Sequence, residues 1–279
     1  MGRGRSGSTF LENQITKRSG AVLLGESRLW PSCYQDDIDC TCGQCKASCP
    51  IWRALISDNK HRPTVQASFE KSLSRRFLLA LLLPRFFMRR VFGQDIANLG
   101  AFYEPLSSLR PGQLIIDSSK NPAFGYALTQ TDSLDVQFLH IVRHPLGVVY
   151  SWKRQRERNP DVPLYRVRKP LMLAALQWTI SNLFCEIAKF RSLGVHRLVR
   201  YEDLADAEKL DSLVASYAVA GNDKNTSEIH AMSGNPGKAS RSGSFVIDDD
   251  WKTSLRWWEK LVYGSVTYPL FLLYRLRQT

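Results

Sequence analysis

Short apolar runs alternate along the chain with longer segments that have helical periodicity. The runs are predicted to be buried strands and span residues 21–24, 113–116, 136–142 and 197–201. The helical segments span residues 10–17, 146–154 and 171–193, with further mixed helical pieces before residue 99. Strands that alternate with helices are typical of parallel βαβ units. The pattern therefore predicts an α/β fold with a three-layer, P-loop-like parallel sheet flanked by helices.

Polar side chains follow several of these predicted strands directly. Glu26, Ser118, Lys120 and Arg143 each lie just beyond the last apolar position of a strand. In open parallel sheets, ligands bind beyond the carboxyl ends of the strands, where such side chains meet. Polar groups at three strand ends therefore predict one shared binding site.

A glycine-rich loop precedes the first helical segment. Glycines at positions 2, 4 and 7 let backbone N–H groups approach an anion, and the helix that follows favours a phosphate at its N-terminus. The spacing imitates a P-loop, but Ser8 stands where the P-loop lysine would be, so positive charge must come from Arg3 or Arg5. The strand before Arg143 ends without the aspartate that would hold magnesium. The loop therefore predicts an anion site that works without a metal.

A second anion-binding element begins at Arg143. This arginine stands at a strand end, and Ser151 follows it two turns along the next predicted helix. A guanidinium pairs with phosphate through two hydrogen bonds, and a serine hydroxyl adds a third. Arg143 and Ser151 together are therefore predicted to bind a terminal phosphate.

Together these elements resemble the two cofactor motifs of sulfotransferases that use 3′-phosphoadenosine 5′-phosphosulfate (PAPS). The motif residues are Arg5, Ser6, Gly7, Ser8 and Thr9 in the first and Arg143-His144-Pro145 with Ser151 in the second. Further matches follow in the family's order: Gly25-Glu26-x-Arg28, Asp117-Ser118-Ser119-Lys120-x-Pro122, Tyr201-Glu202-Asp203-Leu204 and Ser233-Gly234-Asn235-Pro236. The resemblance is to sulfotransferases of the carbohydrate and tyrosylprotein kind and covers nearly the whole chain.

The resemblance implies an enzyme that moves a sulfuryl group from PAPS to a hydroxyl or amine acceptor by in-line transfer. It implies that Glu26 is the base that accepts the acceptor's proton. Lys120 and Arg5 are expected to neutralise charge on the transferred group and the leaving phosphate. The identity of the acceptor is left open, because fold and cofactor motifs do not describe its pocket.

The same resemblance assigns the contacts to PAPS. The first motif, residues 5–9, is expected to hold the 5′-phosphosulfate, and Arg143 with Ser151 the 3′-phosphate. In relatives, a basic residue after the Gly-Asn-Pro step adds a contact to the 3′-phosphate. Both Lys238 and Arg241 are candidates for that contact here.

Relatives have an apolar strand immediately before the phosphate loop, at the centre of the sheet. This sequence starts at Met1-Gly2, inside the loop, so the first strand is expected to be missing or truncated. Its two neighbours in the sheet would then have unpaired edges. Two interpretations remain open: the natural start lies upstream, which we favour, or the product folds poorly and lacks activity.

Five of the six cysteines lie between positions 33 and 49. Cys40, Cys42, Cys45 and Cys49 have the spacing of metal ligands, and four thiolates would hold structural zinc tetrahedrally. Free or redox-active thiols are the alternative. Disulfides are not expected, because the N-terminus lacks the apolar stretch of a secretory signal and a cytoplasmic location is predicted.

The formal net charge of +12 suits an anionic ligand, nucleic acid or an acidic membrane surface. Two alternatives therefore stand beside the sulfotransferase: a P-loop-like nucleotide kinase, and a non-enzymatic basic protein that binds nucleic acid or membrane. The gathering of polar groups at strand ends disfavours the second, and no nucleic-acid partner is expected. PAPS and an unidentified acceptor are the expected partners.

The length of 279 residues predicts one domain, 1–279, with a cysteine-rich loop at 33–49 and a polar, lid-like segment at 222–250. Residues 75–90 are both apolar and basic. Two interpretations of this segment remain open: it contacts a membrane surface, or it is a core helix whose arginine side chains extend to the solvent. The oligomeric state is left open.

Overall fold

The computed structural model describes residues 4–31, 39–44, 48–57, 62–158, 170–192, 195–217, 228–231 and 245–276. Its strands are parallel and are β1 (Val22–Gly25), β2 (Ile115–Asp117), β3 (Phe138–Val142), β4 (His196–Arg200) and β5 (Glu228–Ile229). The helices of the first half are α1 (Ser8–Ser19), η1 (Ser27–Leu29), α3 (Pro50–Trp52), η2 (Arg53–Ser57), α4 (Arg62–Ser72), α5 (Arg75–Ala80), α6 (Arg85–Leu109) and α7 (Pro122–Leu128). Those of the second half are α8 (Pro145–Arg158), α10 (Leu171–Arg191), η3 (Glu202–Ala205), α11 (Ala207–Ala215), α13 (Trp251–Ser254) and α14 (Trp257–Leu276).

The strands form two parallel sheets, in the orders β2-β1-β5 and β3-β4. In the first, Val22 lies opposite Ile115 on one side and Glu228 on the other. In the second, Phe138 pairs with His196. The α/β class and the four strands expected from the apolar runs are therefore confirmed.

The sheet is interrupted between β2 and β3. Among the described residues, β2 pairs only with β1 and β3 only with β4. Side chains from both nevertheless enter one apolar cluster, which contains Ile116 of β2 and Ile141 of β3. The two sheets therefore share part of one core.

Strand β5 differs from what the sequence analysis expected. Residues 228 and 229 belong to the segment 222–250, for which we predicted a polar, lid-like loop. The backbone N–H of Glu228 instead donates to Ala21, and that of His230 donates to Leu23, so this piece adds an edge strand beside β1. A two-residue strand has no periodicity of its own, so only its partner strand reveals it.

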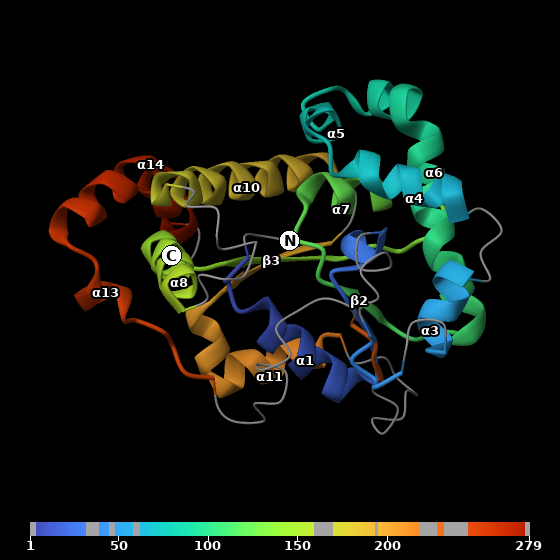
Figure 1. The fold of residues 1–279 in the computed structure, drawn as a ribbon, viewed down its shortest axis with the longest axis horizontal. Coiled ribbons are helices and arrows are strands. Elements are labelled where there is room, and N and C mark those ends of the chain that lie inside the picture. The colour runs from blue at the N-terminus through green and yellow to red at the C-terminus, as the bar shows by residue number, and fades with distance from the viewer. Residues whose placement is uncertain are drawn as a thin grey trace.

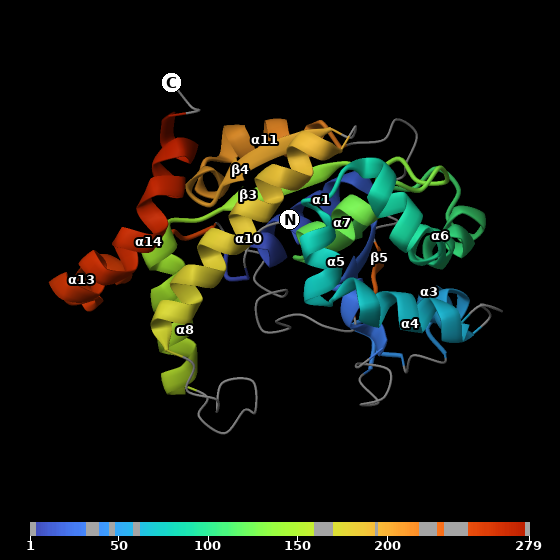
Figure 2. The ribbon, with the colours of Figure 1, turned by 90° about the horizontal axis from the view of Figure 1, so that it is seen from above.

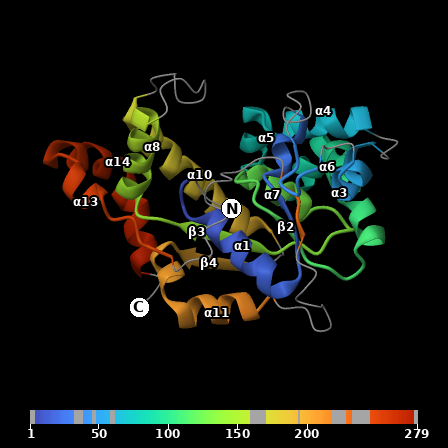
Figure 3. The same cartoon turned by 60° about the horizontal axis from the view of Figure 1, so that its bottom comes forward.

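Helices cover both faces of the sheets (Figure 1). On one face, α1 and α11 lie side by side (Figure 3), and Leu11, Val199 and Val214 pack together there. On the other face, α7, α10 and α6 bury the largest cluster, which includes Leu24 and Phe124. Helix α10 crosses above β3 and β4 toward α14 (Figure 2). The result is the expected three-layer arrangement.

Helix α7 follows the end of β2 and holds the loop before it in place. Asn121 caps the helix, because its Oδ1 accepts hydrogen bonds from the backbone N–H groups of Ala123 and Phe124 at 2.9 and 3.1 Å. Pro122 occupies the first helical position, where a missing N–H costs nothing. Since every residue of α7 is buried, this cap places Lys120 rigidly at the end of β2.

The apolar and basic residues 75–90 are divided between the interior and the surface. Phe77, Leu81 and Met88 are fully buried, whereas Leu82 and Phe86 are 55% and 67% exposed. The segment is therefore partly a core element and partly an apolar surface, and peripheral membrane contact stays a prediction. Among the described helices, α10 has the length and hydropathy of a membrane span, a test that core helices also pass.

Phe102 is the test residue for the core. Its ring is completely buried and contacts Phe69, Tyr103 and Trp30 with centroids 4.7, 5.0 and 5.9 Å away. We expect Phe102→Ala to lower the free energy of unfolding by about 3–5 kcal/mol, measured by urea denaturation. The matched control Phe86→Ala, at an exposed site, is expected to change it by no more than about 0.5 kcal/mol. Equal losses in the two variants would contradict the described core.

Candidate functional site

The glycine-rich loop before α1, residues 4–7, turns sharply into the helix; it is called the phosphate loop below, after the ligand that the sequence predicts for it. Arg5 and Gly7 have φ angles of 75° and 85°, the left-handed conformation that favours glycine. At Gly7 a side chain would also collide with its surroundings, because a Cβ there would lie 2.9 Å from Leu204 and 3.1 Å from Tyr201. The Gly7 carbonyl accepts the first helical hydrogen bonds, from Phe10 at 3.1 Å and from the next residue. The motif therefore folds as predicted, with the first turn of α1 directed by glycine.

Arg143, at the end of β3, reaches the phosphate loop. Its Nη1 donates to the backbone oxygen of Arg5 at 3.1 Å, and its side chain is only 5% exposed. Its guanidinium carbon lies 4.2 Å above the centre of the Tyr201 ring, a cation–π arrangement. The two motifs that the sequence analysis assigned to one cofactor thus touch, although 138 positions separate Arg143 from Arg5.

An aspartate from the C-terminal region contacts the same guanidinium. Nη2 of Arg143 donates to the Asp248 carbonyl at 2.8 Å and lies 3.3 Å from its carboxylate, which Arg154 also binds. Partial burial opposes the charged carboxylate, but Arg143 and Arg154 outweigh it and lower the pKa of Asp248. The sequence analysis missed Asp248, because it belongs to a run of three aspartates with no motif of its own.

His144 follows Arg143 directly in the chain, and Ser151 lies further along, on α8, where it is 8% exposed. The His144 ring stacks on Trp251 with centroids 4.1 Å apart, and burial lowers its pKa to about 4. His144 is thus a packing residue. A Cβ on Gly147 would lie 3.1 Å from Nε of Arg143, so this glycine makes room for the arginine.

Glu26 lies at the end of β1 between two cations. Nζ of Lys120 donates to its Oε1 at 2.6 Å, and Nη2 of Arg28 donates to its Oε2 at 3.0 Å. Burial opposes the charge on Glu26, but the two cations dominate and hold the pKa of the carboxyl below its ordinary value. The predicted base and the predicted charge-neutralising lysine are therefore an ion pair.

Asp117 organises the loop from which Lys120 projects. Its Oδ2 accepts a hydrogen bond from the Tyr103 hydroxyl at 2.5 Å and another from Ser27. Its Oδ1 accepts from the backbone N–H of Ser119 at 2.7 Å. Since these bonds join β2, α6 and the turn after β1, Asp117 supports the site without facing it as a reactive group.

Glu12 is a second carboxylate near Lys120 that the sequence analysis missed. It lies on α1, close to Ser118, Lys120 and Glu26. Burial raises its pKa to about 7, a shift that Ser118 and Lys120 reduce. No sequence signal distinguishes it from the exposed acids of other helices. Its interactions with Ser118 and Lys120 join α1 to the end of β2, beside the Glu26–Lys120 pair.

The cysteine loop forms a separate cluster. Cys40, Cys42 and Cys49 come together with His230, as predicted for three of the four cysteines. Cys45 lies outside the described residues. A hydrogen bond from Cys40 lowers the pKa of the Cys49 thiol below its ordinary value. Nδ1 of His230 lies 3.8 Å from Sγ of Cys40 and 3.2 Å from Sγ of Cys49.

Most of the predicted site residues lie within the described residues and form two groups. Arg143 contacts the loop that contains Arg5 and Gly7. Glu26 and Lys120 form an ion pair at the ends of β1 and β2. Ser6 is buried, and Ser8 and Thr9 open α1. Lys238 and Arg241 lie outside the described residues.

Comparisons with known proteins bear on the fold. No family model matches the sequence, and no curated protein is significantly similar to it. The solved structure of a sulfotransferase domain from the curacin biosynthetic pathway aligns with a TM-score of 0.50 and 15% identity. The alignment covers 95% of this chain and 94% of that one. The chain therefore has the sulfotransferase fold, as the resemblance implied.

The shifted pKa of Glu12 predicts a pH-dependent stability. With a pKa near 4.5 unfolded and about 7 folded, the ionised carboxylate destabilises the fold as pH rises between these values. Glu12→Gln mimics the protonated form, so we expect it to be more stable than the native chain by up to about 3 kcal/mol above pH 7. Below pH 4 the difference is expected to vanish.

The measurement is urea denaturation of both proteins at a series of pH values. Glu104→Gln, at an exposed position, controls for the loss of one negative charge. A stability difference that does not change with pH would show that Glu12 is not held in this environment.

Proposed function

We propose that this chain is a PAPS-dependent sulfotransferase that transfers a sulfuryl group to a hydroxyl or amine acceptor. The observation that carries the proposal is the hydrogen bond from Arg143 to the backbone of Arg5. It joins the two motifs that the family resemblance assigns to the two ends of one nucleotide. The sulfotransferase fold of the chain supports the same function.

The residues around this contact fit a ligand with two separate anionic groups. The first turn of α1 offers backbone N–H groups and the hydroxyls of Ser8 and Thr9 to one of them. Arg143 and Arg154, which already bind the carboxylate of Asp248, offer guanidinium groups to the other. PAPS has a phosphosulfate at its 5′ end and a phosphate at its 3′ position, and it supplies the group to be transferred.

The reaction needs little covalent chemistry from the protein. Lys120 and Arg5 neutralise charge on the group that moves and on the phosphate that leaves. Glu26, whose pKa is held low, is ionised at neutral pH and is therefore in the form that accepts a proton from the acceptor. Because the capped helix α7 and the Asp117 network fix the lysine, it needs no rearrangement of the backbone to act.

Thermal denaturation with different ligands distinguishes a PAPS-dependent sulfotransferase from a nucleotide kinase and from a protein that binds polyanions in general. We expect PAPS and its desulfated product, each added at the same salt concentration, to raise the melting temperature by mass action. ATP with magnesium and short duplex DNA are expected to have little effect. Stabilisation by ATP and magnesium but not by PAPS would overturn the proposal in favour of the kinase.

The role of Arg143 is tested by cofactor affinity. Loss of charge-assisted hydrogen bonds predicts that Arg143→Ala raises the dissociation constant of PAPS about 10- to 100-fold, measured by isothermal titration calorimetry. Arg76→Ala removes the same charge from an exposed position of α5 and is expected to leave the affinity unchanged. Arg143→Lys keeps the charge and is expected to fall between the two. Unchanged affinity in Arg143→Ala would remove this residue from the cofactor site.

The role of Glu26 is tested by the transfer of labelled sulfate to a panel of hydroxyl and amine acceptors. We expect Glu26→Gln to slow transfer about 10²- to 10⁴-fold, because the amide does not accept a proton, while the affinity for PAPS changes little. Glu12→Gln removes the neighbouring carboxylate and is expected to slow transfer far less. The reverse order of the two variants would identify Glu12 as the base.

A further inference from the structure

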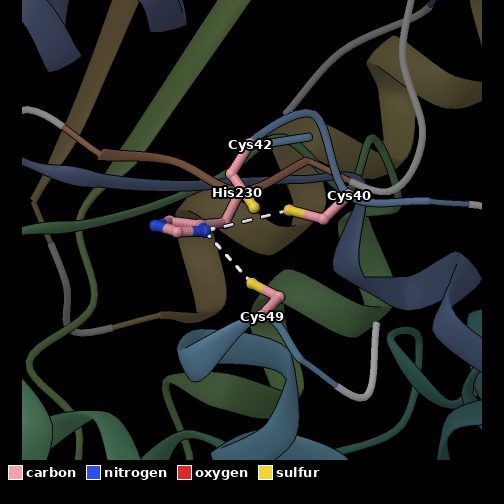
Figure 4. A group of neighbouring side chains, drawn as sticks. All are labelled: Cys40, Cys42, Cys49 and His230. Carbon is pink, nitrogen blue, oxygen red and sulfur yellow. Dashed lines mark hydrogen bonds between the residues drawn. The ribbon is translucent and has the colours of Figure 1, made fainter. Parts of the chain in front are cut away.

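Three cysteines and one histidine converge beside strand β5, away from the contacts of the proposed sulfotransferase site. The ligand atoms of Cys40, Cys42, Cys49 and His230 all lie within 4.8 Å of one another. Figure 4 shows the three thiol groups arranged around Nδ1 of the histidine. No other group of this kind occurs among the residues that the structure describes.

The distances suit a tetrahedral metal. Zinc binds sulfur at about 2.3 Å and imidazole nitrogen at about 2.0–2.1 Å, which places its ligand atoms roughly 3.4–3.8 Å apart. Nδ1 of His230 lies 3.2 Å from Sγ of Cys49 and 3.8 Å from Sγ of Cys40. The set therefore needs to contract by only about 1 Å at its widest separation to reach that geometry.

The histidine is oriented for metal binding by a second shell of contacts. Its Nε2 lies 3.0 Å from a carboxylate oxygen of Glu228. Arg110 holds that carboxylate through two hydrogen bonds of 2.9 Å. A proton on Nε2, donated to Glu228, leaves the Nδ1 lone pair facing the thiols, which is the tautomer that a metal requires.

Local backbone structure directs the cysteines to the same point. Gly43, at a φ of 83°, closes a turn in which its N–H donates to the carbonyl of Cys40 at 3.0 Å. The thiol groups of Cys40 and Cys42 converge beside His230 (Figure 4). Cys49 immediately precedes α3 and is fully buried. Trp52 of that helix donates from its ring N–H to the His230 carbonyl at 2.5 Å. The cysteine loop thus meets His230, 181 positions after Cys49, at one place.

We propose that Cys40, Cys42, Cys49 and His230 bind one Zn²⁺ as a closed structural site. Four protein ligands leave no open position for substrate, which is typical of structural and not catalytic zinc. His230 takes the fourth position that the sequence analysis gave to Cys45.

The metal would stabilise the edge strand β5, which pairs with β1, the strand that Glu26 follows directly. Strand β5 has only two residues and pairs only with β1 among the described strands. The cysteine loop adds to this edge, because Thr41 and Ala231 exchange hydrogen bonds of 3.0 and 2.9 Å. A metal that joins both segments prevents this short edge from fraying and so supports β1.

The first experiment measures metal in the full-length protein purified without chelator, by mass spectrometry of the metal content. We expect about one equivalent of zinc, since a closed thiolate–imidazole site retains its metal through purification. Replacement by Co²⁺ is expected to give the visible bands of tetrahedral cobalt and a thiolate-to-metal charge-transfer band. Less than about a tenth of an equivalent, together with no such bands after cobalt addition, would overturn the proposal.

Matched variants identify the ligands. Cys49→Ser and His230→Ala are expected to lose the metal, whereas Cys45→Ser and Cys185→Ser keep it. His230→Cys keeps four ligands, so we expect it to bind cobalt with a spectrum shifted toward that of four thiolates. Metal binding by this variant would show that His230→Ala loses the metal because it lacks a ligand and not because it misfolds. Loss of metal in Cys45→Ser with retention in His230→Ala would show that the fourth ligand is Cys45.

Two further readouts are independent of sulfotransferase activity. Glu228→Gln is expected to weaken zinc binding about 10- to 100-fold with the cobalt spectrum retained, as for other second-shell carboxylates. Chelation is expected to lower the melting temperature of the native protein and not that of His230→Ala. A disulfide between Cys40 and Cys49 in freshly purified protein, seen as a mass decrease of two hydrogens, would contradict the site.

Discussion

The buried guanidinium of Arg143 is the interaction on which the proposed cofactor site depends. It binds the backbone of the phosphate loop, lies over the Tyr201 ring and pairs with Asp248 of the C-terminal region. A charge that is 95% removed from water needs such partners, because desolvation without them is costly. The same partners hold the arginine in place before any ligand arrives. An incoming phosphate would compete with Asp248 for this guanidinium, so part of its binding energy is offset by the lost ion pair.

A second group of charges, at the ends of β1 and β2, is balanced differently. Lys120 and Arg28 keep Glu26 ionised, whereas the more deeply buried Glu12 has its pKa raised toward neutrality. Two carboxylates near one lysine thus differ in protonation because one is paired with two cations and the other is mainly desolvated. Such a pair is typical of sites that move a proton, which is why comparing the two glutamine variants is informative.

The proposed zinc site would stabilise the short edge strand β5 of the sheet that contains β1 and β2. The described strands form two separate parallel sheets, so β1 depends on β2 and on a two-residue edge strand for its backbone hydrogen bonds. Short parallel edges fray easily, and a metal cross-link between the cysteine loop and His230 would stabilise that edge. The proposed cofactor site and the proposed metal site would therefore act on different parts of the fold: the first would bind the ligand, and the second would stabilise the sheet edge beside β1.

The sequence by itself determined the α/β class and the four main strands and predicted the two anion-binding motifs, because apolar periodicity and glycine or arginine at strand ends are local signals. It also predicted that Glu26 and Lys120 belong to one site, and the two form an ion pair in the structure. Only the tertiary structure revealed Glu12, Asp248, strand β5 and His230. Each owes its role to a partner far along the chain, as His230 does to Cys49, which lies 181 positions before it. A carboxylate or histidine has the same local signature on a surface as in a cluster, and burial beside a specific partner, which folding alone creates, distinguishes the two.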